Sequence, residues 1–429
     1  MLWHACTQTT LSVGVYGIYA LSNAWFVARG VGPEAMAAVN VVAPVVLIVG
    51  AVATTVGVGG ASLVSRHLGA GDTASAARAA GNAFAFFWTT ALLVTVGGLL
   101  AMEPLLAALG ARGDTLGYAR DYATIIIAGA LVGTGFSSLV RAEGRMRFST
   151  VMWVTAILVQ MTLDPLLIFG FDMGVRGAAL GTIGGQAVGT AISLWFFFLQ
   201  RRRPYRIRLA DLRFHGSTVR ALFGVGAPSF LAGFGATLLV VLVNNGLVHS
   251  GGAIALAAFA VCARIQTVVM MPQLGISQGL QPVVGFNAGR GSFDRVRRAE
   301  TLTLRATLIY GAAVAAAVAL LAEPVVGVFV EGDTAAAAVH ALRIIAIGIA
   351  VAGVGPLISA YFQSLGQATP SYVISIGTLL VVKVPLVLAL GRAGTTGVWS
   401  ALAAGEVASA LIAFAILRRR RPSLVSVAA

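Results

Sequence analysis

The sequence predicts an all-α integral membrane protein whose chain crosses the bilayer twelve times. Of the 429 residues, 58% are hydrophobic and 10% are charged, and the mean hydropathy is +0.91. A water-soluble domain of this size has about a quarter of its residues charged. Apolar runs of about 20 residues recur from one end to the other, and each is long enough to cross a ~30 Å hydrocarbon core as a helix. These observations leave no room for a sizeable soluble domain.

Each apolar run defines one expected helix. The 52 glycines and the many alanines suit a packed bundle, because small residues let membrane helices approach closely. The expected helices cover residues 3–28, 37–62, 75–101, 119–140, 149–170, 177–199, 220–247, 254–284, 299–322, 337–362, 371–391 and 396–418.

The basic residues gather in alternate loops between these helices. On one side of the topology lie 21 of the 29 Lys and Arg residues, and six lie on the other side. The positive-inside rule therefore places both termini and the loop 200–219 in the cytoplasm. We expect a multi-pass protein of the plasma (cell inner) membrane. The same distribution accounts for the net charge of +14 without nucleic acid as a partner.

The two halves of the chain are similar to each other. Pro165 matches Pro385, and Gly177 matches Gly397, both at an offset of 220 residues. A direct repeat of six helices keeps the same orientation, so the two bundles should be related by an axis along the membrane normal, with a substrate cavity between them. The expected domains are an N-lobe at 1–199, a basic cytoplasmic linker at 200–219 and a C-lobe at 220–429.

Four polar residues of the N-lobe fall at one depth in the outer half of the membrane. Asp164 lies six residues before the outer end of its helix, roughly 9 Å deep. Gln160 is one turn earlier, and Asn23 and Thr182 are each five residues from an outer helix end. A carboxylate in such a site can exchange a proton, or it can ligate a hard cation such as sodium together with amide and hydroxyl oxygens. The alternative is a polar cluster that only holds the three helices together.

A second set of polar residues lies in the C-lobe. Lys383 and Glu406 fall at matching depth across a short hairpin, which predicts a buried ion pair with either a structural role or a role in coupling. Arg264 lies inside the eighth helix and has no obvious acidic partner in the sequence. Further candidates for a substrate cavity or a polar site are Gln278, Gln281, Asn244 and Met271.

Catalytic and metal-binding patterns are missing from the sequence. Cys6 and Cys262 fall inside apolar segments, where they read as packing residues, and the five histidines are scattered over both sides. No Ser/His/Asp or paired-carboxylate set lies at one depth. We therefore expect no enzyme activity, no cofactor and no dedicated metal site, except for sodium at Asp164 if sodium is the coupling ion.

An ordered set of short motifs covers nearly the whole chain. The motifs are Asn23-Ala-Trp-Phe-Val-Ala-Arg29, Ser65-Arg-His-Leu-Gly-Ala-Gly-Asp72, Arg141-Ala-Glu-Gly144, Leu163-Asp-Pro-Leu-Leu-Ile-Phe-Gly170, Gly275-Ile-Ser-Gln-Gly-Leu-Gln-Pro282 and Gln363-Ser-Leu-Gly366. With this set the chain resembles the multidrug and toxic compound extrusion (MATE) family, in the MepA-like branch of its DinF-related transporters.

The resemblance implies a V-shaped pair of six-helix bundles that exports amphipathic organic cations by alternating access. Inward movement of protons or sodium ions would drive this export. The family's helix-5 acid falls on Asp164, the position one turn before it on Gln160, and the helix-6 hydroxyl on Thr182. Many members have Asp where this chain has Asn23, which leaves Asp164 as the single carboxylate of the site. The acids that the NorM branch uses in helices 7 and 10 have no counterpart.

The expected function is therefore secondary active multidrug efflux by a monomer, with small organic cations and membrane lipids as its partners. The alternative is a flippase of related architecture for a lipid-linked polysaccharide or peptidoglycan precursor. A pyrophosphate-bearing substrate requires several cationic groups at the cavity. Arg264 and Lys383 are the only Lys or Arg residues predicted inside the membrane.

Overall fold

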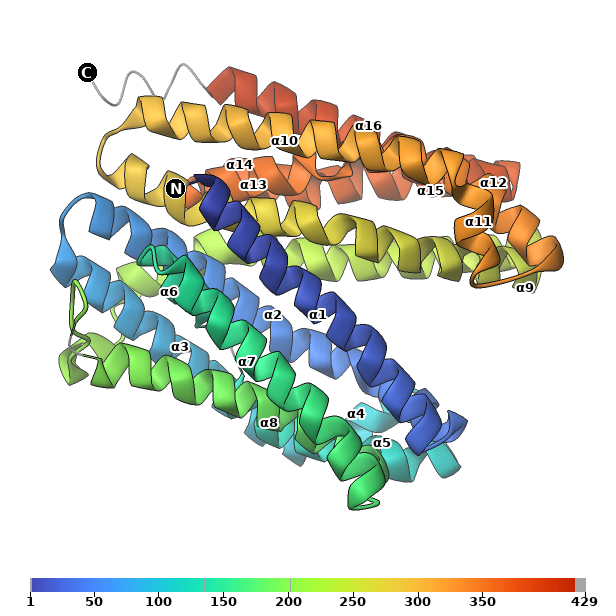
Figure 1. Ribbon diagram of the computed structural model, residues 1–429, viewed down its shortest axis with the longest axis horizontal. Coiled ribbons are helices and arrows are strands. Elements are labelled where there is room, and N and C mark those ends of the chain that lie inside the picture. Colours follow the sequence, from blue (N-terminus) through green and yellow to red (C-terminus); the bar gives the residue numbers. More distant parts are fainter. Residues whose placement is uncertain (1, 134–135, 201, 421–429) are drawn as a thin grey trace. The chain divides into compact units, whose positions relative to one another are not determined.

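The computed structural model describes residues 2–133, 136–200 and 202–420, and within these residues all regular secondary structure is helical (Figure 1). The chain divides into two compact units. The first unit comprises residues 11–230, and the second comprises residues 1–10 together with 231–429.

The first unit is a helical bundle with an aromatic core. Phe84 and Phe136 stack in it with ring centroids 4.1 Å apart. Helices α7 and α8 lie side by side because Gly185 of α8 brings the backbones close: a Cβ there would lie 2.7 Å from the Ala156 carbonyl oxygen (Figure 1). The elements are α1 (Leu2–Gly30, shared with the second unit), α2 (Pro33–Gly69), α3 (Thr73–Leu100), α4 (Met102–Ala108), α5 (Asp114–Ala128), η1 (Gly129–Val132), α6 (Ser137–Ala142), α7 (Met146–Pro165), η2 (Leu166–Gly170), α8 (Gly174–Leu194), η3 (Trp195–Leu199) and η4 (Leu209–Leu212).

The second unit has a core of aliphatic side chains. Leu247, Leu342 and Ile345 are among its fully buried members. The long helix α9 is broken at Gly252, whose φ of 62° is accessible to glycine at little steric cost. The elements are α9 (Gly216–Gly289, which begins in the first unit), α10 (Phe293–Leu320), α11 (Ala322–Gly327), α12 (Gly332–Ala352), α13 (Val354–Ser364), α14 (Ala368–Tyr372), η5 (Val373–Gly377), η6 (Leu379–Lys383), α15 (Val384–Leu390), η7 (Gly391–Ala393) and α16 (Thr395–Arg420).

These elements account in order for the twelve expected helices. Ten helical stretches in the described part of the chain are long and apolar enough to cross a membrane. One of them, α9, contains two expected helices on either side of Gly252, and α1 is the first of the twelve. The short helices α4 and α11 were not expected. The π-helical turns η2, η3, η5 and η6 were not expected either, because hydropathy averaged over a helix does not register a local change of pitch.

The internal repeat extends to the turn geometry. Glycines with positive φ occur in pairs about 220 residues apart, which shows that corresponding turns of the two halves need the same left-handed backbone conformation. Two exposed ion pairs correspond in the same way, Arg120 with Glu103 and Arg343 with Glu323. The glycine pairs are Gly32 and Gly252, Gly71 and Gly291, Gly113 and Gly332, Gly144 and Gly366, and Gly174 and Gly394.

The first turns of α1 pack on α9 within the second unit. The Thr9 hydroxyl donates a hydrogen bond to the Gly275 carbonyl oxygen, and the Cys6 thiol donates to the Ile276 carbonyl oxygen at 3.7 Å. The contact is backbone to backbone, because a Cβ on Gly279 would lie 2.7 Å from the Cys6 Cα.

Candidate ion and substrate site

Asp164 lies near the end of α7 and is completely buried. The Asn23 side chain of α1 donates a hydrogen bond from Nδ2 to Asp164 Oδ2 at 2.7 Å. The other carboxylate oxygen, Oδ1, has no hydrogen-bond partner among the described residues. It faces Gly181 of α8, where a Cβ would lie 2.0 Å from Oδ1. A wholly buried carboxylate with one donor and one open oxygen can accept a cation or a proton.

The remaining predicted residues of this site are connected through a residue that the sequence analysis missed. The Gln160 side chain donates a hydrogen bond to the Tyr19 hydroxyl, and Tyr19 also interacts with the Thr182 hydroxyl. Thr182 itself donates to the Ala178 carbonyl oxygen at 3.1 Å. Side chains of α1, α7 and α8 therefore meet, with Tyr19 linking Gln160 and Thr182. Tyr19 is four residues before Asn23, so helical spacing on α1 was the signal for it.

The chain beside the carboxylate departs from regular α-helix. Pro165 has no N–H, so the carbonyl group of Met161 lacks its normal helical donor. The π-helical turn η2 follows immediately. The chain after Pro165 thus continues as a wider turn, a feature that is frequent at functional sites.

An open hollow of the first unit lies next to this polar cluster. Its volume is about 470 Å³ when the space open to solvent is included, and Gln160 belongs both to its wall and to the polar cluster. Tyr16 and Trp153 meet edge to face in the wall, with ring centroids 6.0 Å apart. The wall consists of Tyr16, Met152, Trp153, Ala156, Ile157, Gln160, Gly185, Gln186 and Gly189. Aromatic rings, a thioether and two amides form a surface suited to amphipathic molecules of varied shape.

In the second unit, Lys383 and Glu406 lie together. Lys383 Nζ donates to Glu406 Oε1 at 2.6 Å, and the two side chains are 20% and 30% exposed. Lys383 is the last residue of the π-helical turn η6. Its side chain crosses Gly405 of α16, where a Cβ would lie 3.2 Å from Lys383 Cγ.

The other candidates of the second unit are spread along α9. Arg264 is exposed, and Gln278, Asn244 and Met271 are partly buried. Gln281 donates a long hydrogen bond of 3.5 Å to Gln363. The structure does not bring these residues to the Lys383–Glu406 pair or into one pocket.

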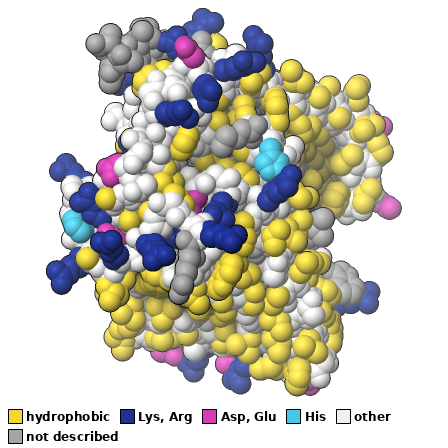
Figure 2. Space-filling model, turned by 60° about the vertical axis from the view of Figure 1, so that its left-hand side comes forward, with side chains coloured by type: hydrophobic (Ala, Val, Ile, Leu, Met, Phe, Trp, Pro, Cys, Tyr) yellow, Lys and Arg dark blue, Asp and Glu magenta, His cyan; other side chains and the backbone are white. Residues whose placement is uncertain are grey.

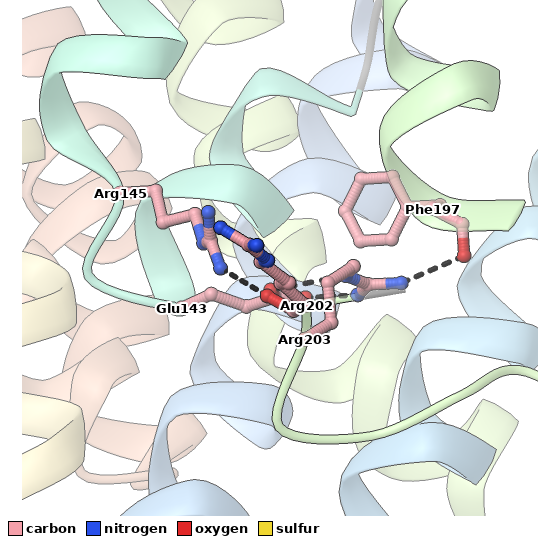
Figure 3. Close-up of polar contacts among 5 residues, drawn as sticks. All are labelled: Glu143, Arg145, Phe197, Arg202 and Arg203. Atoms are coloured by element: carbon pink, nitrogen blue, oxygen red, sulfur yellow. Dashed lines mark hydrogen bonds and ion pairs between the residues drawn. The ribbon is translucent and has the colours of Figure 1, made fainter. Parts of the chain in front are cut away.

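A second buried ion pair, missed by the sequence analysis, lies at the predicted cytoplasmic side of the first unit (Figure 3). Glu143 accepts two hydrogen bonds from Arg203, and their side chains are 0% and 1% exposed. Arg203 also donates to the Phe197 carbonyl oxygen at 2.7 Å. Its guanidinium group lies over the rings of Phe196, Phe197 and Tyr205 at 4.9, 4.4 and 4.6 Å.

Further polar groups surround this pair. Arg145 donates a hydrogen bond to the Arg202 carbonyl oxygen beside it (Figure 3). Burial, and then the Glu143 carboxylate, raises the pKa of the Tyr205 phenol well above its ordinary value, so Tyr205 stays neutral. The pair joins the turn before α7 to the segment after η3.

Comparison with known proteins decides the family. A model of the MatE family matches residues 11–166 and 228–388. The chain belongs to the MatE family. Members of this family are transporters and not enzymes, and the resemblance found in the sequence is confirmed.

Relatives of this MATE chain extend over nearly its whole length. It is 26% identical over 426 residues to the multidrug export protein MepA of Staphylococcus aureus (strain MSSA476), which covers 96% of this chain and 91% of that protein. It is 27% identical to MepA of Staphylococcus saprophyticus over 420 residues, covering 95% and 90%.

The fold also matches a solved transporter. A multidrug resistance MATE family transporter of the MOP superfamily, in an outward-facing conformation, superposes with a TM-score of 0.94 at 25% identity, covering 99% of this chain and 96% of that one. The twelve-helix membrane fold and the assignment to multidrug efflux transporters are therefore confirmed.

Proposed function

We propose that this MATE transporter exports amphipathic organic cations by antiport with protons or sodium ions, and that Asp164 binds the coupling ion. The observation that carries the proposal is the burial of Asp164 with one oxygen bonded to Asn23 and the other without a partner among the described residues. An unneutralised carboxylate in the membrane interior is costly, so an arriving cation or proton is stabilised there.

The polar side chains around Asp164 are compatible with both ions. A proton needs only the open oxygen Oδ1. A sodium ion needs several oxygen ligands, and Asn23 can supply one when its amide turns to present oxygen instead of nitrogen. The Tyr19 and Thr182 hydroxyls and the Gln160 amide carry further neutral oxygen atoms on the same three helices, and these can act as ligands.

Ion binding and export are coupled through α1 in this mechanism. Neutralising Asp164 removes the charge that holds Asn23, and α1 then repacks against α7 and α8 and expels the substrate. The ion drives this change only to the extent that its affinity differs between the two conformations. Gln160 connects the ion site with the hollow where the substrate would lie against Trp153 and Tyr16 by cation–π contact.

The test is efflux of a fluorescent cationic dye from vesicles that contain the full chain, under separately imposed proton and sodium gradients. We expect gradient-driven efflux in the wild type and its loss in Asp164→Asn. Asp172→Asn is the matched control, since Asp172 is exposed and its positive φ of 51° suits asparagine. Normal gradient-driven transport by Asp164→Asn would contradict the mechanism.

The same experiment separates efflux from the alternative flippase function. If the wild type moves no dye under either gradient, lipid-linked precursors are the next substrates to test. Lys383 is paired with Glu406, so Arg264 is the remaining cationic side chain among the predicted intramembrane residues. A single cationic group is a poor match for a pyrophosphate, which requires several. We further propose that the protein is a monomer with both termini in the cytoplasm.

A further inference from the structure

Two separate clamps hold residues 202–215, here called the linker segment, on the first unit. The Glu143–Arg203 pair is the first clamp (Figure 3). Asn82 of α3 is the second: its Nδ2 donates to the Asp211 and Arg213 carbonyl oxygens at 3.0 and 3.2 Å, and its Oδ1 accepts from the His215 backbone N–H at 2.9 Å. The linker segment is therefore a fixed surface.

The linker segment has one side that packs on the unit and one side that faces outward. Tyr205 is buried, and Ile207 and Leu212 pack against the aromatic core. The outward side carries two large apolar side chains, Leu209 at 86% and Phe214 at 54% exposed. With them are the exposed side chains of Arg206, Arg208 and Arg213.

The acidic side chain of the linker segment, Asp211, is hydrogen-bonded within the segment itself. The Asp211 carboxylate accepts a hydrogen bond from the Arg208 backbone N–H at 2.8 Å, which fixes the turn η4. Glu143 is enclosed with Arg203. The outward side is thus basic and apolar at once. Figure 2 shows many basic side chains together with hydrophobic ones on the face that includes the left-hand side of Figure 1.

The depth of the linker segment follows from its contact with α3. The 28 residues of α3 measure about 42 Å, so the helix exceeds a ~30 Å hydrocarbon core by about 6 Å at each end. Gly81 is eight residues after the first residue of α3, about 12 Å along the axis. A Cβ on Gly81 would lie 2.4 Å from the Asp211 carbonyl oxygen. For a helix centred on the core, Gly81 lies about 6 Å inside the hydrocarbon edge, so the linker segment at Asp211 lies within reach of both headgroups and acyl chains.

We propose that the linker segment is a binding surface for anionic phospholipids of the cytoplasmic leaflet. Arg206, Arg208 and Arg213 bind the headgroup phosphates, and Leu209 and Phe214 enter the acyl region. Because the backbone is held in place, Leu209 and Phe214 cannot be buried by a local rearrangement of the linker segment. Insertion into lipid removes these two apolar side chains from water. Guanidinium groups beside them complement phosphate. This inference rests on the cytoplasmic orientation and not on Asp164.

The first test measures phosphatidylglycerol and phosphatidylcholine adducts on the purified full chain by native mass spectrometry. We expect Arg206→Gln/Arg208→Gln/Arg213→Gln to lower phosphatidylglycerol affinity on the order of tenfold or more, with little effect on phosphatidylcholine. The matched control removes three exposed arginines at the start of α10 in the second unit, Arg295→Gln/Arg297→Gln/Arg298→Gln. An equal loss in this control would mean that only net charge matters, and would overturn the proposal.

The second test places Leu209 directly. A nitroxide attached to Leu209→Cys should be more accessible to oxygen, which concentrates in acyl chains, than to a water-soluble nickel complex. Cys6 and Cys262 are buried, so they need not be removed. Higher accessibility to the nickel complex would place Leu209 in water and overturn the proposal, whatever the arginine variants do.

Discussion

At the scale of single residues, the Asp164 site depends on a missing side chain as much as on those present. Gly181 faces Asp164 Oδ1 at a distance that no Cβ tolerates. Glycine at this position lets α8 come close to the carboxylate.

Gly181→Ala should therefore disturb the site without changing any polar group. The added Cβ would lie 2.0 Å from Oδ1, so the carboxylate must move. We expect gradient-driven efflux to fall by roughly 10- to 100-fold, as displacements of about 1 Å do at functional sites. Gly14→Ala is the control, because a Cβ at Gly14 meets nothing within 4 Å. Equal efflux by the two variants would show that the position of Asp164 is unimportant.

Counting residues from the helix ends predicts the depth of a side chain in the membrane, but it does not predict the direction in which that side chain points around the helix axis. Asn23 and Asp164 were expected at one depth, and they form a hydrogen bond. Gln160 and Thr182 were also expected there, yet each reaches Tyr19, which the sequence analysis did not consider. Glu143 lies in a turn and Arg203 lies 60 residues later, in the linker that folds back onto that turn. Helical spacing cannot predict a contact between two such segments.

At the scale of elements, one pair of neighbouring helical segments carries the Lys383–Glu406 ion pair. The hairpin from α15 to α16 brings Lys383 and Glu406 together, as depth counting predicted. Depth counting did not predict the π-helical turns of the preceding segment or the break of α9 at Gly252. These features depend on the φ and ψ angles of a few residues, whereas periodicity reports an average over a whole helix.

The Lys383–Glu406 pair should behave as one unit in a double-mutant cycle. Each single alanine variant leaves one charge without its partner. The double variant should therefore lower the melting temperature by less than the sum of the two single variants. We expect a coupling free energy of about 1 kcal/mol, since the side chains are partly exposed and screened. Efflux assays on the same variants decide the role: recovery in the double variant indicates a structural pair. Additive effects on melting and efflux would mean that the pair is energetically irrelevant.

At the scale of the whole molecule, composition and repeat were sufficient for the fold class. Hydropathy indicated twelve helices, and an offset of about 220 residues recurs in the positive-φ glycines and in the pairs Glu103–Arg120 and Glu323–Arg343. The predicted domain ranges stay a prediction. Residues 1–10 belong with the second unit, which no composition shift could indicate because α1 is apolar throughout.

The orientation can be measured with single cysteines. Ser217→Cys and Arg112→Cys are exposed positions at predicted cytoplasmic and external ends, and the two native thiols are buried. In intact spheroplasts, a membrane-impermeant maleimide should label Arg112→Cys, and it should label Ser217→Cys only after the membrane is opened. The unmodified chain gives the background. The reverse pattern would invert the topology and move the linker segment to the outer leaflet.

The packing of α1 on α9 also sets an order of events during synthesis. Cys6 and its acceptor, the Ile276 carbonyl group, are separated by 270 residues. A ribosome that adds about 5–20 residues per second needs roughly 14–54 s to make that stretch. During this interval the first turns of α1 are already made, but the glycine surface of α9 on which they rest does not yet exist. The first turns of α1 can thus reach these contacts only after a stretch 270 residues further along the chain has been made.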